Sequence, residues 1–333
     1  MRPADVEPYV RGSAWPAGEL AAYPRCDPGP LGLRLPADTR ASAALPVGVR
    51  LEFEGACGAI EIAYRTETRE LGYRGAGAGT RFVLFRDGAR VSDAEAVLGE
   101  GSVRLAGGRG DARAVVYLPE GMRPSVLGVG AIGGAIRPAP REPRWICHGD
   151  SIVEGWCASE PAGAWPHVAA REHGLDVVNL GYAGAARGEL ASAEEIAQLP
   201  ADVVSIAHGT NCWTRTPHSA EVFAAGLRAF LDLVRTGHPK TPIVAISPIL
   251  RADAERLPNK LGATLADLRA AFEAVIEQRR AAGDGRLTLV RGLPLVPRER
   301  LPDGIHPDDA GHLQLARALG PVVRAAYEGA KHA

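Results

Sequence analysis

The sequence predicts two domains of different class, a small all-β sandwich of the jelly-roll kind followed by an α/β domain with a doubly wound parallel sheet. Up to about residue 135, short alternating apolar runs are separated by Gly and Asp, which is typical of antiparallel strands. After residue 144, short apolar runs alternate with long amphipathic stretches, as in a parallel sheet covered by helices on both faces. The segment 138–144 is rich in proline and charge and is expected to be a linker. We therefore expect domains at 1–137 and 145–333.

The composition limits the number of hydrophobic cores, the kind of partner and the location that we expect for the protein. A chain of 333 residues with 46% hydrophobic content can form two cores. Its 38 basic and 39 acidic residues give a net charge of -1 without a basic stretch, so we expect a small-molecule or neutral-polymer partner rather than nucleic acid or a membrane. The N-terminus has charges and prolines where a signal peptide has an apolar core, and no run could span a bilayer, which favours a cytoplasmic protein.

The cysteines are an odd number without a C-x-x-C motif: Cys26, Cys57, Cys147, Cys157 and Cys212. We expect free thiols, with a secreted chain carrying one or two disulfides as the alternative.

Each expected element follows from its local pattern. Period-two alternation predicts strands in the first domain at 48–55, 59–65, 80–91, 102–107 and 112–119. Short apolar runs predict buried strands in the second domain at 144–151, 176–184, 202–211, 242–249 and 286–292. Helical periodicity predicts helices at 164–174, 220–237, 261–283 and about 309–328.

Polar or glycine-rich turns follow three of the predicted parallel strands. Ser151 ends the first, Gly184 the second and Asn211 the third, while Asp303 and His306 precede the last helix. Because ligands bind beyond the carboxyl ends of parallel strands, these residues are expected to share one rim of the sheet.

These residue types suit nucleophilic catalysis. Serine needs a base, and the base needs a third group that fixes its tautomer. His306 can be the base, and Asp303, three residues earlier, can orient it. The backbone N–H groups of Ser151 and Gly184 and the side-chain amide of Asn211 are candidate oxyanion donors.

The set Ser151, Gly184, Asn211 and His306 resembles the SGNH (GDSL-type) hydrolase family over about residues 144–328, including the aspartate three residues before the histidine. The resemblance implies a flavodoxin-like sheet and an ester hydrolase that works through an acyl-Ser151 intermediate without a cofactor or metal. The stretch HGDSIVEGWCASEP and a later G-x-x-x-G-E look like a subgroup with an N-terminal β-sandwich, built similarly to carbohydrate esterases that deacetylate sugars.

Structural roles remain alternatives. Ser151 and His306 could cap helices, Asp303 could be a turn residue, and Gly184 and Asn211 could be chosen for their backbone freedom. Asp150 is expected to hold the turn before Ser151.

Other residues close in sequence to Ser151, Gly184 and Asn211 are candidates for substrate contact or for lining the pocket. Trp213, Trp156, Glu154 and Arg187 are candidate substrate contacts on the rim. His148 and His208 are expected to pack at strand ends rather than bind a metal. Cys157 and Cys212 are expected to line the pocket wall.

Three functions stay open. The first is removal of a small acyl group, such as acetyl, from a carbohydrate or metabolite. The second is an acyltransferase or thioesterase that uses the same intermediate, and the third is a glycan-binding module that has lost catalysis.

Overall fold

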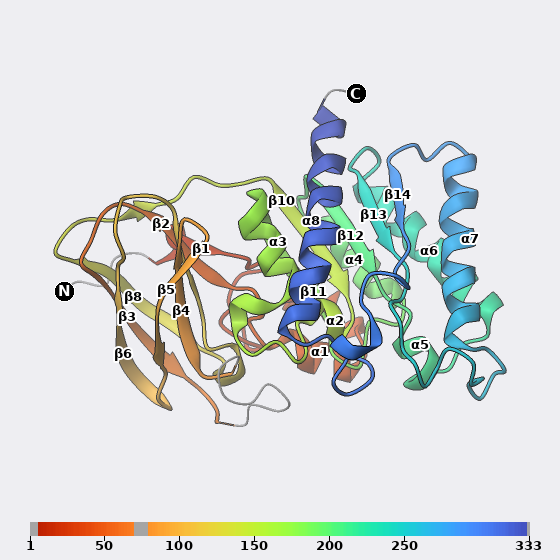
Figure 1. The fold of residues 1–333 in the computed structure, drawn as a ribbon, viewed down its shortest axis with the longest axis horizontal. Coiled ribbons are helices and arrows are strands. Elements are labelled where there is room, and N and C mark those ends of the chain that lie inside the picture. Colours follow the sequence, from red (N-terminus) through yellow and green to blue (C-terminus); the bar gives the residue numbers. More distant parts are fainter. Residues whose placement is uncertain (1–5, 70–78, 332–333) are drawn as a thin grey trace.

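The computed structural model describes residues 6–69 and 79–331. Two parts lie side by side, antiparallel sheets formed by the N-terminal part and a parallel sheet with its helices formed by the rest (Figure 1).

The N-terminal sheets are antiparallel throughout the described residues. One contains, in spatial order, β1 (Val10–Arg11), β2 (Arg50–Glu54), β7 (Ala114–Tyr117), β4 (Arg81–Arg86) and β5 (Ala89–Glu95), and β9 (Arg137–Pro138) pairs with β2. The other contains β6 (Gly99–Ala106), β3 (Ala59–Thr66) and β8 (Ser125–Ile132). Apolar side chains of both sheets form one core, so the predicted antiparallel β part is present.

Alternating burial along the strands reproduces the sequence pattern. In β3 the side chains of Ile60, Ile62 and Tyr64 are buried while those between them are more exposed. The run 80–91 forms two strands, because Asp87 and Gly88 have φ values of 50° and 75° and make the tight turn of a hairpin.

The second part has a five-stranded parallel sheet. Its spatial order is β11 (Asp176–Gly181), β10 (Arg144–Gly149), β12 (Val203–Ala207), β13 (Ile243–Ile246) and β14 (Leu287–Val290). Its first strand in sequence therefore lies between the second and third, the flavodoxin-like order. The predicted doubly wound α/β fold is confirmed.

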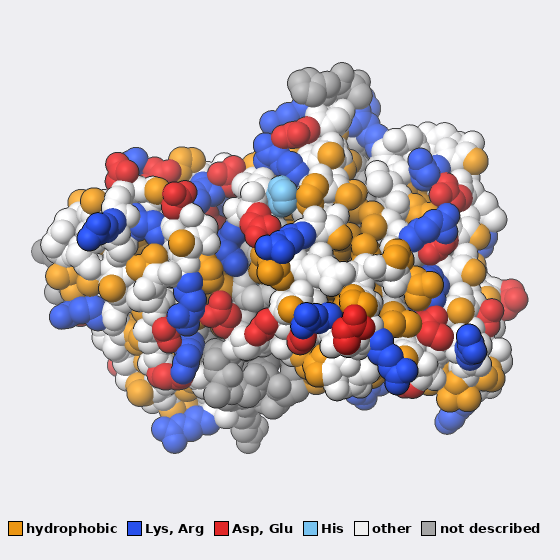
Figure 2. All heavy atoms as spheres, in the orientation of Figure 1, with side chains coloured by type: hydrophobic (Ala, Val, Ile, Leu, Met, Phe, Trp, Pro, Cys, Tyr) orange, Lys and Arg blue, Asp and Glu red, His pale blue; other side chains and the backbone are white. Residues whose placement is uncertain are grey.

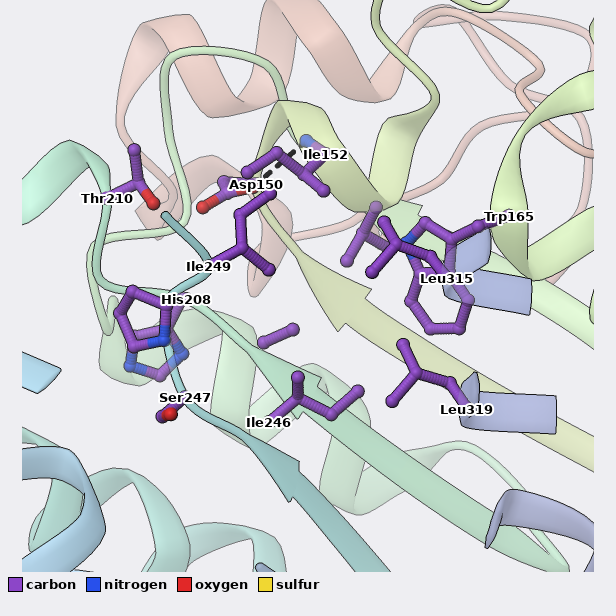
Figure 3. A pocket seen from close by; sticks show the side chains of 13 residues that line it. Asp150, Ile152, Trp165, His208, Thr210, Ile246, Ser247, Ile249, Leu315 and Leu319 are labelled. Carbon is purple, nitrogen blue, oxygen red and sulfur yellow. Dashed lines mark hydrogen bonds between the residues drawn. The ribbon is translucent and has the colours of Figure 1, made fainter. Parts of the chain in front are cut away.

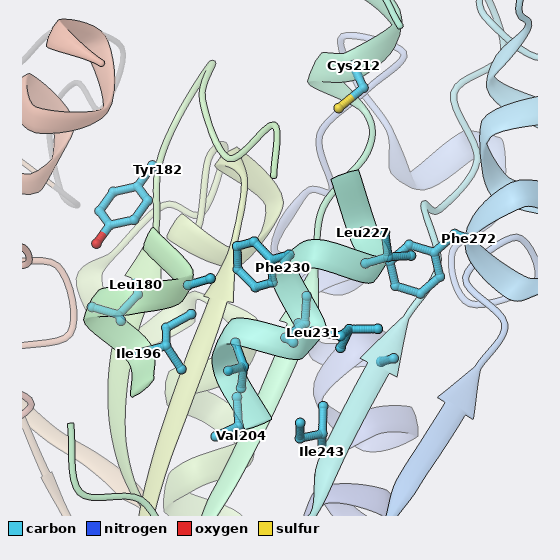
Figure 4. Packing of buried hydrophobic residues seen from close by; sticks show 14 of the residues in the cluster. Leu180, Tyr182, Ile196, Val204, Cys212, Leu227, Phe230, Leu231, Ile243 and Phe272 are labelled. Atoms are coloured by element: carbon cyan, nitrogen blue, oxygen red, sulfur yellow. The ribbon is translucent and has the colours of Figure 1, made fainter. Parts of the chain in front are cut away.

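Helices cover both faces of this sheet. On one face lie α3 (Trp165–His173) and α8 (Asp309–Lys331); on the other lie α4 (Leu190–Gln198), α6 (Ala220–Gly237) and α7 (Leu265–Ala281). Successive residues of β10 face opposite sides of the sheet. Trp145 and Cys147 pack in the hydrophobic core under α3 and α8, whereas Ile146 packs in the core under α4, α6 and α7, part of which is shown in Figure 4. Two one-turn helices, α2 (Ser151–Glu154) and α5 (Asn211–Thr214), begin within a few residues of the ends of β10 and β12.

The segment between β1 and β2 packs against the α/β part. Cys26, Leu35 and Ala43 belong to the same hydrophobic core as Leu180 and Ile206 of the parallel sheet. This segment contains α1 (Ala37–Ala43), which the sequence pattern did not predict. Seven residues are too few for a helical period to show, and a helix this short depends on tertiary packing.

The five cysteines are free thiols, as predicted. Within residues 6–69 and 79–331, every helix is too short or too polar to be a candidate for a bilayer span. Basic and acidic side chains are interspersed over the face shown in Figure 2.

A buried ion-pair network joins the antiparallel part to the parallel sheet. Arg50 of β2 donates to Glu52 at 2.7 Å, to Asp176 of β11 at 2.8 Å and to the carbonyl of Val177 at 3.0 Å. The Arg50 side chain is 2% exposed. Removing one member of such a network leaves the others buried without their counter-charge.

We expect Arg50→Ala to lower the free energy of unfolding by about 3 to 5 kcal/mol, because Asp176 then loses its cation. Urea denaturation followed by circular dichroism measures this. The control is Arg104→Ala, whose side chain is 66% exposed and pairs with Glu61 at 3.5 Å; we expect a loss below about 1 kcal/mol. Equal losses in the two variants would contradict the role given to Arg50.

Candidate active site

Ser151 lies at the carboxyl end of β10, in a tight strand-to-helix turn. The side chain of Asp150 accepts a hydrogen bond from the Ile152 N–H at 3.0 Å and caps α2, as expected for a residue that holds the turn. A Cβ at Gly149 would lie 2.4 Å from the Ala207 carbonyl oxygen, so only glycine fits there. The turn fixes Ser151 at the rim of the sheet.

Ser151, His306 and Asp303 form a hydrogen-bonded chain. Ser151 Oγ lies 2.8 Å from His306 Nε2, and His306 Nδ1 lies 2.5 Å from Asp303 Oδ2. Because a carboxylate can only accept, His306 Nδ1 carries the proton and Nε2 accepts from the serine hydroxyl. This is the tautomer that a general base requires.

Backbone hydrogen bonds fix the Asp303 carboxylate. Its Oδ1 accepts from the N–H groups of Ile305 at 2.9 Å and His306 at 2.7 Å. Burial acts to raise the pKa of Asp303, but the hydrogen bonds from the His306 side chain and these N–H groups outweigh it, and the pKa is lowered. Asp303 is thus an anion at neutral pH.

His306 is a neutral base in a mostly buried position. Burial lowers its pKa and the hydrogen bond and charge of Asp303 raise it, with a net lowering. The Trp156 ring stacks on the imidazole, with centroids 5.1 Å apart and planes at 20°. Trp156 therefore covers one face of His306, where its ring can stabilise an imidazolium.

The candidate oxyanion donors come from three neighbouring loops. Gly184 has a φ of 70°, and its N–H donates no hydrogen bond to a described residue. The N–H of Ser151, first in α2, has no acceptor within its helix. Asn211 Nδ2 donates to the Ala185 carbonyl at 2.7 Å, which ties the Asn211 turn to the Gly184 loop.

Glu154 lies beneath the rim rather than on it, with no exposed surface. Its carboxylate accepts from the Ala183 N–H at 2.5 Å and from Ser42 Oγ at 2.9 Å, and it pairs with Arg25 at 3.9 Å. A ligand therefore cannot reach it in this structure. It fixes the residue before Gly184 and links that loop to α1.

Arg187 is occupied by acidic neighbours. It makes two 2.8 Å hydrogen bonds to Asp38 of α1 and one of 3.1 Å to Glu189. Trp213 is partly buried, and its Nε1 donates to the Leu257 carbonyl at 2.8 Å. The structure thus gives both predicted substrate contacts intramolecular partners.

Several residues near the site carry no sequence signal. Arg251 lies with its guanidinium 4.8 Å from the centre of the Trp213 ring, and its charge acts to lower the pKa of His306. Arg25 and Ser42 reach Glu154 from a segment more than one hundred residues upstream. No motif marks them, since only the packing of this segment against the sheet brings them near.

A cavity of about 30 Å³ lies behind the Ser151 turn (Figure 3). Asp150, His208, Thr210 and Ser247 contribute polar groups to its lining. Burial is the largest influence on Asp150 and raises its pKa to about 7. The cavity has room for about two water molecules, so it is too small to be a substrate pocket.

The histidines at the strand ends pack in an apolar environment. His148 and His208 lie 5.3 and 5.2 Å from the ring centre of Phe230. Burial lowers their pKa values to about 4 and about 3, so both rings are neutral at pH 7.

Among the described residues, ligand atoms of Cys157, Asp303 and His306 lie within 4.8 Å of one another, and two of these residues belong to the hydrogen-bonded chain.

Comparisons with known proteins cover both parts of the chain. The model of the GDSL-like lipase/acylhydrolase family matches residues 147–313. A solved salicylyl-acyltransferase from a tetracycline biosynthetic pathway is 25% identical, with a TM-score of 0.78 over 96% of this chain and 94% of its own. A GDSL-like protein from Bacteroides ovatus is 21% identical, with a TM-score of 0.79 over 96% and 95%.

A family two carbohydrate esterase from Clostridium thermocellum, in complex with cellohexaose, is 16% identical, with a TM-score of 0.59 over 83% of this chain and 91% of its own. At these identities, the last two similarities show a shared fold. No curated protein sequence matches the chain.

We expect His306 to titrate below the ordinary histidine pKa of about 6.5, because burial outweighs its contact with Asp303. NMR of selectively labelled histidine measures this. Asp303→Asn removes the charge that raises the pKa, so the value should fall further, whereas Asp93→Asn, in the antiparallel part, should leave it unchanged. A higher pKa in Asp303→Asn would contradict the coupling.

Proposed function

Because the chain belongs to the GDSL-like lipase/acylhydrolase family, we propose that it is a serine acyl hydrolase with Ser151 as nucleophile, His306 as general base and Asp303 as the residue that orients His306. The observation that carries the proposal is the hydrogen-bonded chain from Ser151 Oγ through His306 to Asp303. No cofactor or metal is required for this chemistry.

The proposed reaction has two halves. Ser151 Oγ attacks the ester carbonyl while its proton moves to His306 Nε2, and Asp303 stabilises the resulting imidazolium. The oxyanion is stabilised by the N–H groups of Ser151 and Gly184 and by the Asn211 amide. His306 then protonates the leaving alcohol, and an acyl-Ser151 ester remains. Water, deprotonated by His306, attacks this ester; His306 then returns the proton to Ser151 Oγ as the acyl–oxygen bond breaks and the acid is released.

For the substrate, we propose a small acyl group, such as acetyl, on a carbohydrate or metabolite. The support is the motif resemblance to sugar deacetylases and the fold shared with a carbohydrate esterase. On the same basis, we propose a jelly-roll topology for the antiparallel sheets, with the boundaries 1–137 and 145–333 for the two domains.

Acyl transfer, or hydrolysis of a thioester, is the second candidate function. The same acyl-Ser151 can react with an acceptor hydroxyl instead of water. The likeness to a salicylyl-acyltransferase extends over 96% of this chain, which supports transfer in metabolite tailoring as an alternative fate of the intermediate.

We expect wild-type protein to cleave p-nitrophenyl acetate and Ser151→Ala to lose about a thousandfold or more in kcat, since no nucleophile remains. His306→Ala should lose a similar factor. Ser125→Ala, in β8 of the antiparallel part, is the matched control and should keep full activity. Retained activity in Ser151→Ala would refute the nucleophile. Failure of the wild type to turn over a broad panel of esters would favour the binding-module hypothesis.

Transfer and hydrolysis differ in how the products depend on acceptor. If the chain is a hydrolase, added alcohols and sugars leave the acid as the main product. If it is a transferase, one acceptor class diverts most of the acyl group at millimolar concentration. Mass spectrometry of products over a panel of acceptor hydroxyls measures the ratio, with Ser151→Ala as the blank for uncatalysed transfer.

A further inference from the structure

Arg215 lies against the proposed oxyanion donors. It directly follows α5, and its N–H donates to the Asn211 carbonyl at 2.9 Å. Residues four apart on a helical turn share one face, so Arg215 and Asn211 face the same loop. A Cβ built on Gly184 would lie 3.6 Å from Arg215 Nε and 3.7 Å from Nη2. The guanidinium therefore covers Gly184.

Arg215 differs from the other arginines around the site. Arg187 is paired with Asp38, Arg251 with Asp253, and Arg25 with Glu154. Arg215 is exposed and forms no ion pair with a residue of 6–69 or 79–331. Its guanidinium keeps its hydrogen-bond donors available beside the reacting centre.

The acids near the rim are already committed to other partners. Glu154 is buried and bonded to Ala183 and Ser42, Asp303 accepts from His306, and the Asp150 carboxyl is buried under the turn. Arg251 adds a second positive charge, which acts on His306. The rim next to Gly184 thus offers a cation without a competing carboxylate.

We propose that Arg215 forms an anion-binding subsite of the active site and that the substrate carries a carboxylate or phosphate close to its scissile ester. This inference rests on the proposed function, since it assumes that the reacting carbonyl lies between Ser151 and Gly184. A guanidinium is suited to this role because its planar donors bind both oxygens of a carboxylate or phosphate.

The anionic group can belong to the acyl half or to the alcohol half of the substrate. Two probe pairs separate these sources. The anionic acyl probe is the p-nitrophenyl monoester of succinate, with p-nitrophenyl butyrate as its neutral match. The anionic alcohol probe is 4-acetoxybenzoate, with its methyl ester as the neutral match.

The experiment compares kcat/KM of wild type, Arg215→Gln, Arg215→Lys and the remote control Arg104→Gln on all four esters. For at least one anionic probe, we expect Arg215→Gln to lower kcat/KM about tenfold relative to the wild type. For the neutral match of that probe, kcat/KM should stay within about twofold of the wild-type value. Arg215→Lys should recover part of the loss, because lysine restores the positive charge but not the pair of parallel N–H donors of the guanidinium. The wild-type preference for the anionic probe should fall with added salt.

Equal losses on anionic and neutral esters, or no loss on either, would overturn the anion subsite while leaving the hydrolase intact. If the wild type cleaves no ester, the proposed function fails, and the subsite is tested by binding alone. Calorimetry with succinate and benzoate on Ser151→Ala should then show affinity that the Ser151→Ala, Arg215→Gln double variant lacks. Equal or undetectable affinity in both would refute the subsite.

Discussion

The parallel pairing of β10 with β11 on one side and β12 on the other is the constraint on which the candidate site depends. Its register sets Gly149 beside Gly181 and Ala207, so the three strands end at nearly the same level. Ser151, Gly184 and Asn211 follow those ends within a few residues and meet at one rim. Asp303 and His306 are then brought to Ser151 by the loop that leads into α8.

A second constraint is electrostatic and comes from the start of the chain. A charge buried without a partner costs several kcal/mol, and the Glu154 carboxylate has no exposed surface. Arg25 and Ser42 from the N-terminal segment supply its partners, while Glu154 in turn fixes the Ala183 N–H. Asp38 of α1 binds Arg187, which lies in the loop that contains Gly184. The segment around α1 is therefore part of the support of the Gly184 loop.

Burial and hydrogen bonding give the site its protonation states. Burial keeps the His306 imidazole neutral, and the N–H groups around Asp303 keep that carboxylate charged. A neutral base beside an anion is the starting state that proton abstraction from serine requires. Trp156, stacked on the imidazole, restricts the ring to the plane in which Nε2 faces Ser151.

The sequence alone predicted the five parallel strands, most of the antiparallel strands, the helices α3, α6, α7 and α8, and the residues of the hydrogen-bonded chain. Each of these depends on a local pattern: apolar periodicity, a strand-ending glycine turn, or an aspartate three residues before a histidine. Strand β8 and helix α4 were not among the predicted elements. Tertiary structure decided the rest. Helix α1 is too short for its period to show, and Arg25, Arg251 and Arg215 acquire their roles from neighbours distant in sequence. Glu154 was expected on the rim but lies buried, since only packing distinguishes a charge facing solvent from one held by Arg25. Contacts across such separations leave no periodic trace in a single chain.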